Sequence, residues 1–212
     1  FTRLRPTHHP DFMNEVKIKI CGLFREQDIE YANALKPDYI GFVFAKSHRQ
    51  VTPGQAKKLR QKLAPGMIPV GVFVDEPVEH VAKLLSDGVI EMAQLHGHED
   101  EKYITELRKL SGKRIIQAFR ITENRDEERA VLSTADDILL DGGSGSGVQF
   151  DWTLIQEVKR PFFLAGGLNP ENVSEAIRVV KPFAVDASSG VETGKVKDFE
   201  KMRRFIEAVR GV

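Results

Sequence analysis

Short apolar runs alternate along this chain with segments in which apolar residues recur every three or four positions, and the pattern repeats eight times. In PVEHVAKLLSDG, for example, Val78, Val81, Ala82 and Leu85 fall on one helical face. The runs between such segments are short and β-rich, which predicts strands. The expected strands are KIKICG (17–22), YIGFVF (39–44), IPVGVFVD (68–75), EMAQLHG (91–97), RIIQAFRI (114–121), DDILLDG (136–142), PFFLAGG (161–167) and FAVDASSG (183–190).

Capping residues agree with this alternation. Thr52 and Asn169, each followed by proline, are expected to open the helices over 55–63 and 171–180, and Asp87 before a glycine is expected to close the third helix. Asp151 is expected to cap a helix that begins at Trp152.

Eight strand–helix pairs of about 25 residues imply parallel strands, because each crossover needs a dozen or more residues. The sequence therefore predicts a single α/β domain, a (β/α)8 TIM barrel near the lower size limit. A doubly wound open sheet is the competing fold, but the first strand-to-helix turn has no G-x-G-x-x-G.

Composition narrows the class of protein and the compartment in which we expect it. The 212 residues are 41% hydrophobic, with 31 basic and 31 acidic side chains, so a broad nucleic-acid surface is not expected. No apolar run is long enough to span a membrane or serve as a secretory signal, and we expect a cytoplasmic protein. One cysteine excludes an internal disulfide. Residues 1–13 lack periodicity and are expected to be a loose leader before a barrel over 14–212.

Polar groups and glycines stand where these strands end. In a TIM barrel the carboxyl ends of the strands and the loops that follow them surround one pocket. The residues concerned are Cys21-Gly22, Phe44-Ala45, Val74-Asp75, His96-Gly97, Arg120, Asp141-Gly142, Gly166-Gly167 and Asp186 with Ser188, Ser189 and Gly190. We therefore expect the active site at this end.

The loops after the seventh and eighth strands predict a phosphate site. Gly166 and Gly167 let the backbone approach an anion closely, while Ser188, Ser189 and Gly190 offer hydroxyl and amide donors. The alternative is that these residues only make turns. The glycine-rich loop after the sixth strand, residues 142–149, is expected to be a mobile lid or else a plain connection.

The single thiol lies at the mouth of the predicted barrel. Alternation along the first strand turns Lys19 and Cys21 inward and Ile18 and Ile20 toward the helices. The Lys19 ammonium is expected to lower the pKa of the thiol so that it can act as a base. A small buried hydrophobic role is the alternative for Cys21.

Asp141, at the end of the sixth strand, is the predicted acid. Burial is expected to keep it protonated, and its strand does not neighbour the first, so the two groups would address opposite sides of a ligand. The alternatives are a loop-anchoring role for Asp141 and an acid–base role for His96.

Several ordered motifs make the chain resemble the phosphoribosylanthranilate isomerases of tryptophan biosynthesis. The resemblance runs from about Lys17 to Arg210. It rests on KICG (19–22), GFVFAKSHR (41–49), VGVFVDE (70–76), QLHG (94–97), ILLDGGSGSG (138–147), FDW (150–152), AGGLNPENV (165–173) and AVDASSGVE (184–192).

The resemblance implies an Amadori rearrangement that needs no metal or cofactor and acts on a small phosphorylated substrate. It makes Cys21 the general base and Asp141 the general acid, pairs Arg49 with the anthranilate carboxylate and brings Asp186 to the substrate. The resemblance assigns the binding of the phosphate group to Gly166, Gly167, Ser188, Ser189 and Gly190. The sequence leaves open a monomer or a homodimer.

Other readings remain. A pentose-phosphate epimerase would need a histidine and carboxylate metal cluster, and indole-glycerol-phosphate synthase a lysine and glutamate pair, neither of which these strand ends offer. A non-catalytic phosphosugar-binding barrel is the alternative from a different class.

Overall fold

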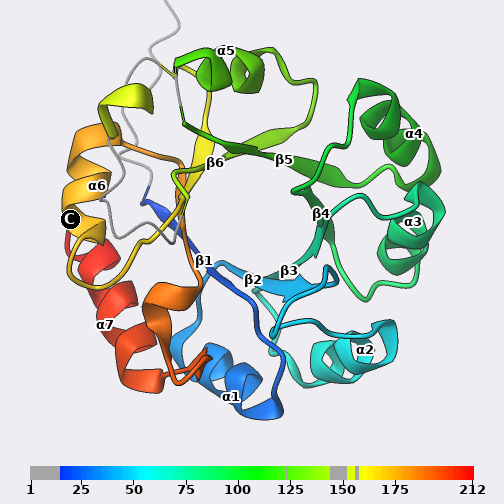
Figure 1. The fold of residues 1–212 in the computed structure, drawn as a ribbon. Coiled ribbons are helices and arrows are strands. Elements are labelled where there is room, and N and C mark those ends of the chain that lie inside the picture. The colour runs from blue at the N-terminus through cyan, green and yellow to red at the C-terminus, as the bar shows by residue number, and fades with distance from the viewer. Residues whose placement is uncertain (1–14, 123, 144–151, 156–157) are drawn as a thin grey trace, which may run out of the picture.

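Eight parallel strands close into a ring in chain order, β1 to β8, with β1 paired to both β2 and β8 (Figure 1). The computed structural model describes residues 15–122, 124–143, 152–155 and 158–212. The strands are β1 Lys17–Cys21, β2 Tyr39–Val43, β3 Ile68–Phe73, β4 Met92–Leu95, β5 Arg114–Arg120, β6 Asp137–Asp141, β7 Phe162–Ala165 and β8 Ala184–Ala187. The ring confirms the predicted barrel and rules out an open sheet.

Helices cover the outside of the ring (Figure 1). They are α1 Glu26–Leu35, α2 Pro53–Lys62, α3 Val78–Ser86, α4 Glu101–Ser111, α5 Asn124–Leu132, α6 Val173–Val180 and α7 Phe199–Arg210, with short 3-10 helices η1 Trp152–Ile155 and η2 Ser189–Val191. A two-stranded hairpin, β9 Glu192–Thr193 and β10 Val196–Lys197, follows η2. This hairpin lies between the loop after β8 and α7, and its strands were not expected from the sequence.

Two of the predicted helix boundaries are confirmed. Thr52 caps α2 by accepting from the Gln55 N–H, and Asp87 is the C-cap of α3. In contrast, α6 begins at Val173, because the Asn169 side chain caps a preceding turn by accepting from the backbone N–H of Asn172.

After β6, a helix begins at Trp152 as predicted. In the described residues of this segment it is the short 3-10 helix η1 and not an α-helix. The predicted cap, Asp151, lies outside the described residues, as does the predicted leader.

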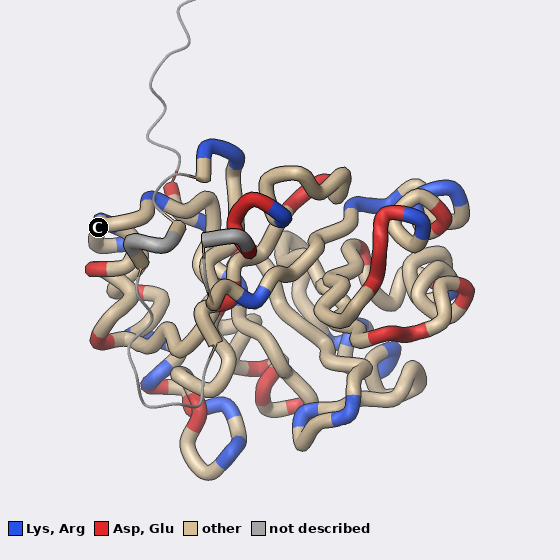
Figure 2. Tube along the Cα trace, turned by 45° about the horizontal axis from the view of Figure 1, so that its top comes forward, with Lys and Arg blue, Asp and Glu red and all other residues tan. Residues whose placement is uncertain are grey.

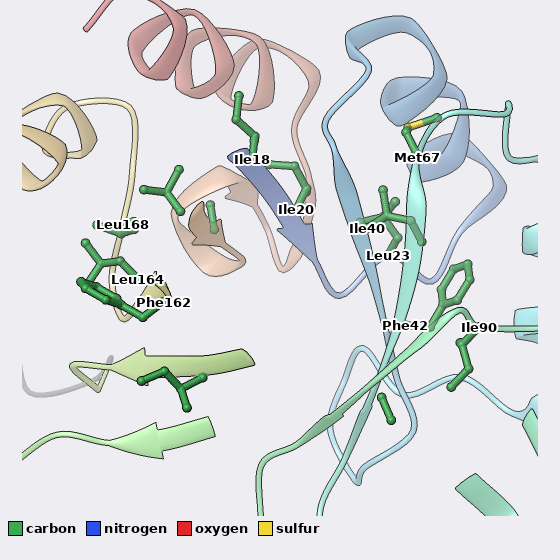
Figure 3. Packing of buried hydrophobic residues seen from close by; sticks show 14 of the residues in the cluster. Ile18, Ile20, Leu23, Ile40, Phe42, Met67, Ile90, Phe162, Leu164 and Leu168 are labelled. Carbon is green, nitrogen blue, oxygen red and sulfur yellow. The ribbon is translucent and has the colours of Figure 1, made fainter. Parts of the chain in front are cut away.

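The alternation of side chains divides the apolar residues between two sides of the ring. Ile18 and Ile20 belong to the outer core between strands and helices (Figure 3). Tyr39 on β2 meets Phe163 on β7 edge to face, with ring centroids 5.3 Å apart, although these strands are not neighbours. Both rings therefore lie inside the barrel, where they fill its lower part with the inner cluster Val70, Met92, Ile116, Leu139, Phe163, Ala165 and Ala184.

Next to this apolar cluster, at β1 and β8, the interior is polar. Lys19 is level with Tyr39 on one side and with Asp186 on the other, so all three face inward. Cys21, one inward position higher, is level with Gly41. The closure of β1 on β8 thus places the thiol, the ammonium and a carboxylate at one corner of the mouth.

On the outer surface, basic and acidic residues are interspersed along the helices and loops (Figure 2). The described part of the chain contains no helix that is both long and apolar enough to cross a membrane.

Candidate active site

Cys21, Lys19 and Asp186 form a buried group where β1 meets β8. The Lys19 Nζ donates to Asp186 Oδ2 at 2.7 Å, and Lys19 is completely buried. Burial alone would lower the pKa of Lys19, but the charges and hydrogen bonds of Asp186 and Cys21 together outweigh it and raise that pKa. Burial raises the pKa of Asp186, against the opposing effect of the Lys19 charge. The other oxygen of that carboxylate, Oδ1, is buried without a hydrogen-bond partner among the described residues.

The predicted direction of the Cys21 pKa shift is wrong. Burial raises the pKa of the thiol above its ordinary value, and the positive charges of Lys19 and Lys197 offset this rise without reversing it. Cys21 is 8% exposed, so the cost of desolvating a thiolate exceeds the attraction of the two ammonium groups. The sequence identified the neighbouring cation correctly but could not show the depth of burial.

Two glycines make room around the thiol. A Cβ on Gly41 would stand 2.6 Å from the Cys21 Sγ. Gly22 has φ +81°, and a Cβ there would overlap the Cδ of Arg49. The Arg49 side chain therefore passes directly over the backbone that follows the cysteine, from the loop after β2.

Arg49 is already paired in the structure. Its Nε and Nη2 donate to the two carboxylate oxygens of Glu192, at 2.7 and 2.8 Å. Lys197 donates to Glu192 Oε1 at 2.6 Å and to the Ser188 carbonyl at 3.1 Å. Burial raises the pKa of Glu192, but the hydrogen bonds from Arg49 and Lys197 outweigh it and lower the pKa to about 2.

Glu192 and Lys197 were missed from the sequence. Both lie on the β9–β10 hairpin, and both are buried, with Lys197 only 2% exposed. The only sequence signal was the charged pattern VETGKVKD directly after the serine turn, which reads as an ordinary solvated loop. The pairing of Glu192 with Arg49 spans 143 positions of chain, so no local pattern predicts it.

On the far side of the mouth, Asp141 ends β6 and meets His96 from the loop after β4. The His96 Nε2 lies 3.4 Å from Asp141 Oδ2, and the His96 Nδ1 lies 3.1 Å from the Gln94 side-chain nitrogen. If Gln94 donates to Nδ1, then the proton of neutral His96 is on Nε2, where it faces Asp141. The Gly143 N–H also donates to Asp141 Oδ1, at 2.8 Å.

The expectation that burial keeps Asp141 protonated is therefore wrong. Burial does raise the pKa of Asp141, but the hydrogen bonds from His96 and the Gly143 N–H outweigh it, and the pKa lies below its ordinary value. His96, ranked below Asp141 from the sequence, is its direct partner.

A cavity of about 420 Å³ opens beside this pair. It is lined by Val74, His96, Gly97, His98, Ala118, Arg120, Asp141 and Gly143. Arg120 lies near Asp141 and acts on its pKa in the lowering direction. A larger cavity, about 550 Å³, lies outside the ring between α2 and α3. Phe44 lines it, but none of the predicted catalytic or substrate-binding residues does.

The two predicted phosphate loops lie against each other. Gly166 and Gly167 have φ of +102° and +68°, which favour glycine, and a Cβ on Gly166 would stand 2.9 Å from Asp141 Oδ1. A Cβ on Gly190 would overlap the carbonyl of Leu168. The loop after β7 thus packs on the loop after β8, as a shared anion site requires.

The serine turn is tied to the first strand. The Ser188 hydroxyl donates to the Cys21 carbonyl at 3.1 Å, and Ser189 begins η2. Of the predicted lid, only Gly142 and Gly143 are described, and the rest lies outside the described residues. Within the described ranges, no three histidine, cysteine or acidic side chains gather as a metal site would require.

The structure therefore brings the predicted residues to one end of the barrel in two groups. Cys21, Asp186, Arg49 and Ser188 share the β8–β1 corner through the contacts given above, and Asp141 with Gly166 lies across at β6 and β7. The groups are close enough for the Asp141 charge to raise the pKa of Asp186.

Comparisons with known proteins agree with this arrangement. A protein from Thermoanaerobacter sp. (strain X514) named N-(5'-phosphoribosyl)anthranilate isomerase is 46% identical over 204 residues, covering 93% of this chain and 99% of the relative. The crystal structure of phosphoribosyl anthranilate isomerase from Thermotoga maritima matches with a TM-score of 0.85 and 38% identity, over 93% of this chain and 100% of that one.

A second solved structure, of a phosphoribosyl anthranilate isomerase in complex with reduced 1-(o-carboxyphenylamino)-1-deoxyribulose 5-phosphate, matches with a TM-score of 0.83 and 38% identity, again over 93% of this chain and 100% of that one. The family model described as N-(5'phosphoribosyl)anthranilate (PRA) isomerase matches residues 18–208. The chain therefore belongs to the N-(5'-phosphoribosyl)anthranilate isomerase family.

Proposed function

We propose that this isomerase converts N-(5-phosphoribosyl)anthranilate to 1-(2-carboxyphenylamino)-1-deoxyribulose 5-phosphate, a step of tryptophan biosynthesis, by an Amadori rearrangement. Cys21 is the general base and Asp141 the general acid. One observation carries the proposal: the thiol sits among buried ammonium groups at the β8–β1 corner, while a carboxyl group faces a cavity at the opposite β6 side.

In the first step the Asp141 proton goes to the ring oxygen of the sugar. The bond between that oxygen and C1 breaks, and the nitrogen lone pair forms a C=N bond to C1. In the second step the Cys21 thiolate removes the proton from C2. The electrons of that C–H bond form a C1=C2 bond, and the C=N electrons return to nitrogen. The resulting enol becomes the C2 ketone when its hydroxyl proton leaves and C1 gains a proton.

The acid role requires a change of protonation on binding. The pKa of Asp141 is lowered in the unliganded protein. The substrate brings a phosphate and a carboxylate into the mouth, and added negative charge raises the pKa of a nearby carboxyl group. We infer that Asp141 holds its proton mainly in the enzyme–substrate complex.

The base role depends on compensation of negative charge. The Lys19 and Lys197 ammonium groups both lower the pKa of the thiol, against burial. The raised pKa makes the thiolate a strong base, and the two ammonium groups lower the cost of forming it. Asp186, with its unpartnered Oδ1, supplies an acceptor for a hydroxyl group of the sugar.

The remaining groups hold the two ends of the substrate. The phosphate is assigned to the amides and hydroxyls of Gly166, Gly167, Ser188, Ser189 and Gly190, where two loops pack together. Arg49 is assigned to the anthranilate carboxylate, which its remaining N–H groups can bind.

The test is the Cys21→Ala variant. Turnover, followed as the loss of substrate fluorescence, should fall about 10²–10⁴-fold, the usual contribution of a general base. Binding of the reduced product analogue should stay within about threefold of wild type, since the thiol makes no essential ground-state contact. Turnover at the wild-type rate would remove Cys21 from the mechanism. A wild-type protein that binds the analogue but never turns over would favour the non-catalytic barrel.

A further inference from the structure

The β9–β10 hairpin brings a buried carboxylate to the arginine of the mouth. Glu192 is 9% exposed and takes two hydrogen bonds from Arg49, one to each oxygen, in the fork geometry that arginine forms with carboxylates. Arg49 comes from the loop after β2, so this contact joins the loops of β2 and β8 above the thiol. Such a bidentate bond fixes the plane of the guanidinium group as well as its position.

Glu192 is itself held from several directions. Lys197, which is almost fully buried, bonds its Oε1, and the Lys201 side chain bonds its backbone carbonyl at 2.7 Å. His48 approaches on the other side, with its Nε2 3.8 Å from Oε2. Because these contacts keep the Glu192 carboxylate in place, a movement of the Arg49 guanidinium group would break its hydrogen bonds to Glu192. Glu192 therefore restrains Arg49.

The contact uses only one edge of the guanidinium group. The Arg49 guanidinium group has five N–H bonds, and two of them, one on Nε and one on Nη2, donate to Glu192. Both N–H bonds of Nη1 and the second one of Nη2 remain. Among the described residues no side chain or carbonyl accepts from Nη1. A second carboxylate can therefore bind the free edge while Glu192 keeps the first.

We propose that Glu192 is a positioning residue, which aims the free edge of Arg49 at the carboxylate of the substrate and is itself held in place by Lys197. This inference rests on the proposed function, because it assumes that Arg49 binds the anthranilate carboxylate. It adds a reason why Arg49 would favour a substrate that carries this carboxylate.

The opposite effect would follow if Glu192 competed with the substrate carboxylate for Arg49. Removing its charge would then tighten binding. In a positioning role, removal frees the arginine to adopt many rotamers, and binding of a carboxylate weakens because this freedom must be lost again. The sign of the change in affinity therefore separates the two roles.

The experiment compares two probes, the reduced product analogue 1-(2-carboxyphenylamino)-1-deoxyribulose 5-phosphate and its phenylamino counterpart without the ring carboxylate. Dissociation constants are measured by calorimetry for wild type, Arg49→Met, Glu192→Gln and the double variant. We expect Glu192→Gln to weaken the carboxylated probe about 10-fold and the other probe less than about twofold. On the Arg49→Met background, Glu192→Gln should have no further effect.

Each other result is decisive. If Arg49→Met leaves the ratio of the two affinities unchanged, the carboxylate assignment of the proposed function fails and the inference fails with it. If Arg49→Met lowers the ratio but Glu192→Gln does not, only the positioning role fails. Tighter binding of the carboxylated probe by Glu192→Gln makes Glu192 a competitor and also overturns the positioning role.

Two further variants guard against an effect of folding alone. Glu192→Gln leaves Lys197 buried without its counter-ion, so Glu192→Gln with Lys197→Met removes both charges and should give the same change in the ratio of affinities. Glu207→Gln is the matched control, because it breaks the exposed Arg203–Glu207 pair, 2.7 Å long, near the C-terminal end of α7. It should leave both dissociation constants unchanged.

Discussion

The two sides of the barrel mouth present ionisable groups in opposite ways. At the β8–β1 corner, Lys19 and Lys197 are buried and bonded to Asp186 and Glu192, with contacts of 2.6–2.7 Å. On the β4–β6 side, the side chains of His96 and Asp141 are 33% and 24% exposed, and their closest approach is 3.4 Å. One side is a dry array of fixed charges, and the other is a wetter pair beside a cavity.

This difference suggests how a single site could hold the proposed base and the proposed acid. Burial raises the pKa of Cys21, and the fixed ammonium groups beside it limit that rise. Asp141 is held below its ordinary pKa by hydrogen bonds that a bound anion can counteract. We therefore expect the electrostatic environment of the dry side to stay constant and the pKa of Asp141 on the wet side to change when substrate binds.

The largest expected effect is on kcat/KM and follows from a substitution on the wet side. Asp141→Asn should lower kcat/KM about 10²–10⁴-fold. In the wild-type enzyme, with the thiol pKa raised and the Asp141 pKa lowered, the thiolate fraction rises about tenfold per pH unit while the protonated acid falls by the same factor. The wild-type kcat/KM should therefore be nearly flat from pH 6 to 8, within the span of the two shifted pKa values.

Without the acid, only the rise of the thiolate fraction remains. The residual kcat/KM of Asp141→Asn should then increase about tenfold per pH unit over the same range. A profile for this variant that stays flat would show that Asp141 does not act as the acid. Asp87→Asn is a suitable control, since Asp87 is the C-cap of α3, just before the start of β4 and at the opposite end of the barrel from the mouth.

The next largest effect is on the free energy of unfolding and follows from a substitution on the dry side. Lys19→Met keeps the shape of the side chain but leaves Asp186 buried without its counter-ion, which should cost about 3–5 kcal/mol of unfolding free energy. His96→Asn on the wet side should cost about 1 kcal/mol, because Asp141 can turn to water. Chemical denaturation measures both, and similar losses for the two variants would contradict the contrast between the sides.

The smallest expected effect is on the melting temperature at acid pH, and it concerns Glu192 on the dry side. The folded pKa of Glu192 is about 2, below its ordinary 4.5. A lowered folded pKa means that Glu192 stabilises the protein above pH 4.5, and that this contribution is lost as pH falls toward 2. The melting temperature of Glu192→Gln should therefore fall less between pH 5 and pH 3 than that of wild type.

We expect a difference in melting temperature of roughly 2–4 °C, which corresponds to about 1 kcal/mol in a domain of this size. Glu171→Gln, which breaks an exposed pair, should follow the wild-type curve. Parallel curves for wild type and Glu192→Gln would mean that the buried pairing with Arg49 and Lys197 does not contribute to stability above pH 4.5.

The barrel was predictable because its signals are local. The period of two in KIKIC turned Lys19 and Cys21 inward, and the structure confirms that Ile18 and Ile20 pack outside the ring. The pocket end was predictable because glycines such as Gly166 and Gly190 follow apolar runs, and both do sit where a side chain would clash. The type of the helix after β6 was not predictable, since Trp152, the expected start of that helix, begins a 3-10 helix in the described residues.

By itself, the sequence determined the strand order, the face on which each strand residue lies and the residues gathered at the mouth, because all three follow from short-range periodicity. Only the tertiary structure decided the charge states there. The pKa of Cys21 is raised by its burial, that of Asp141 is lowered by His96 and Gly143, and the fork of Arg49 is held by Glu192. Burial and partners from distant segments set a pKa, and neither is written in the neighbouring residues of the chain.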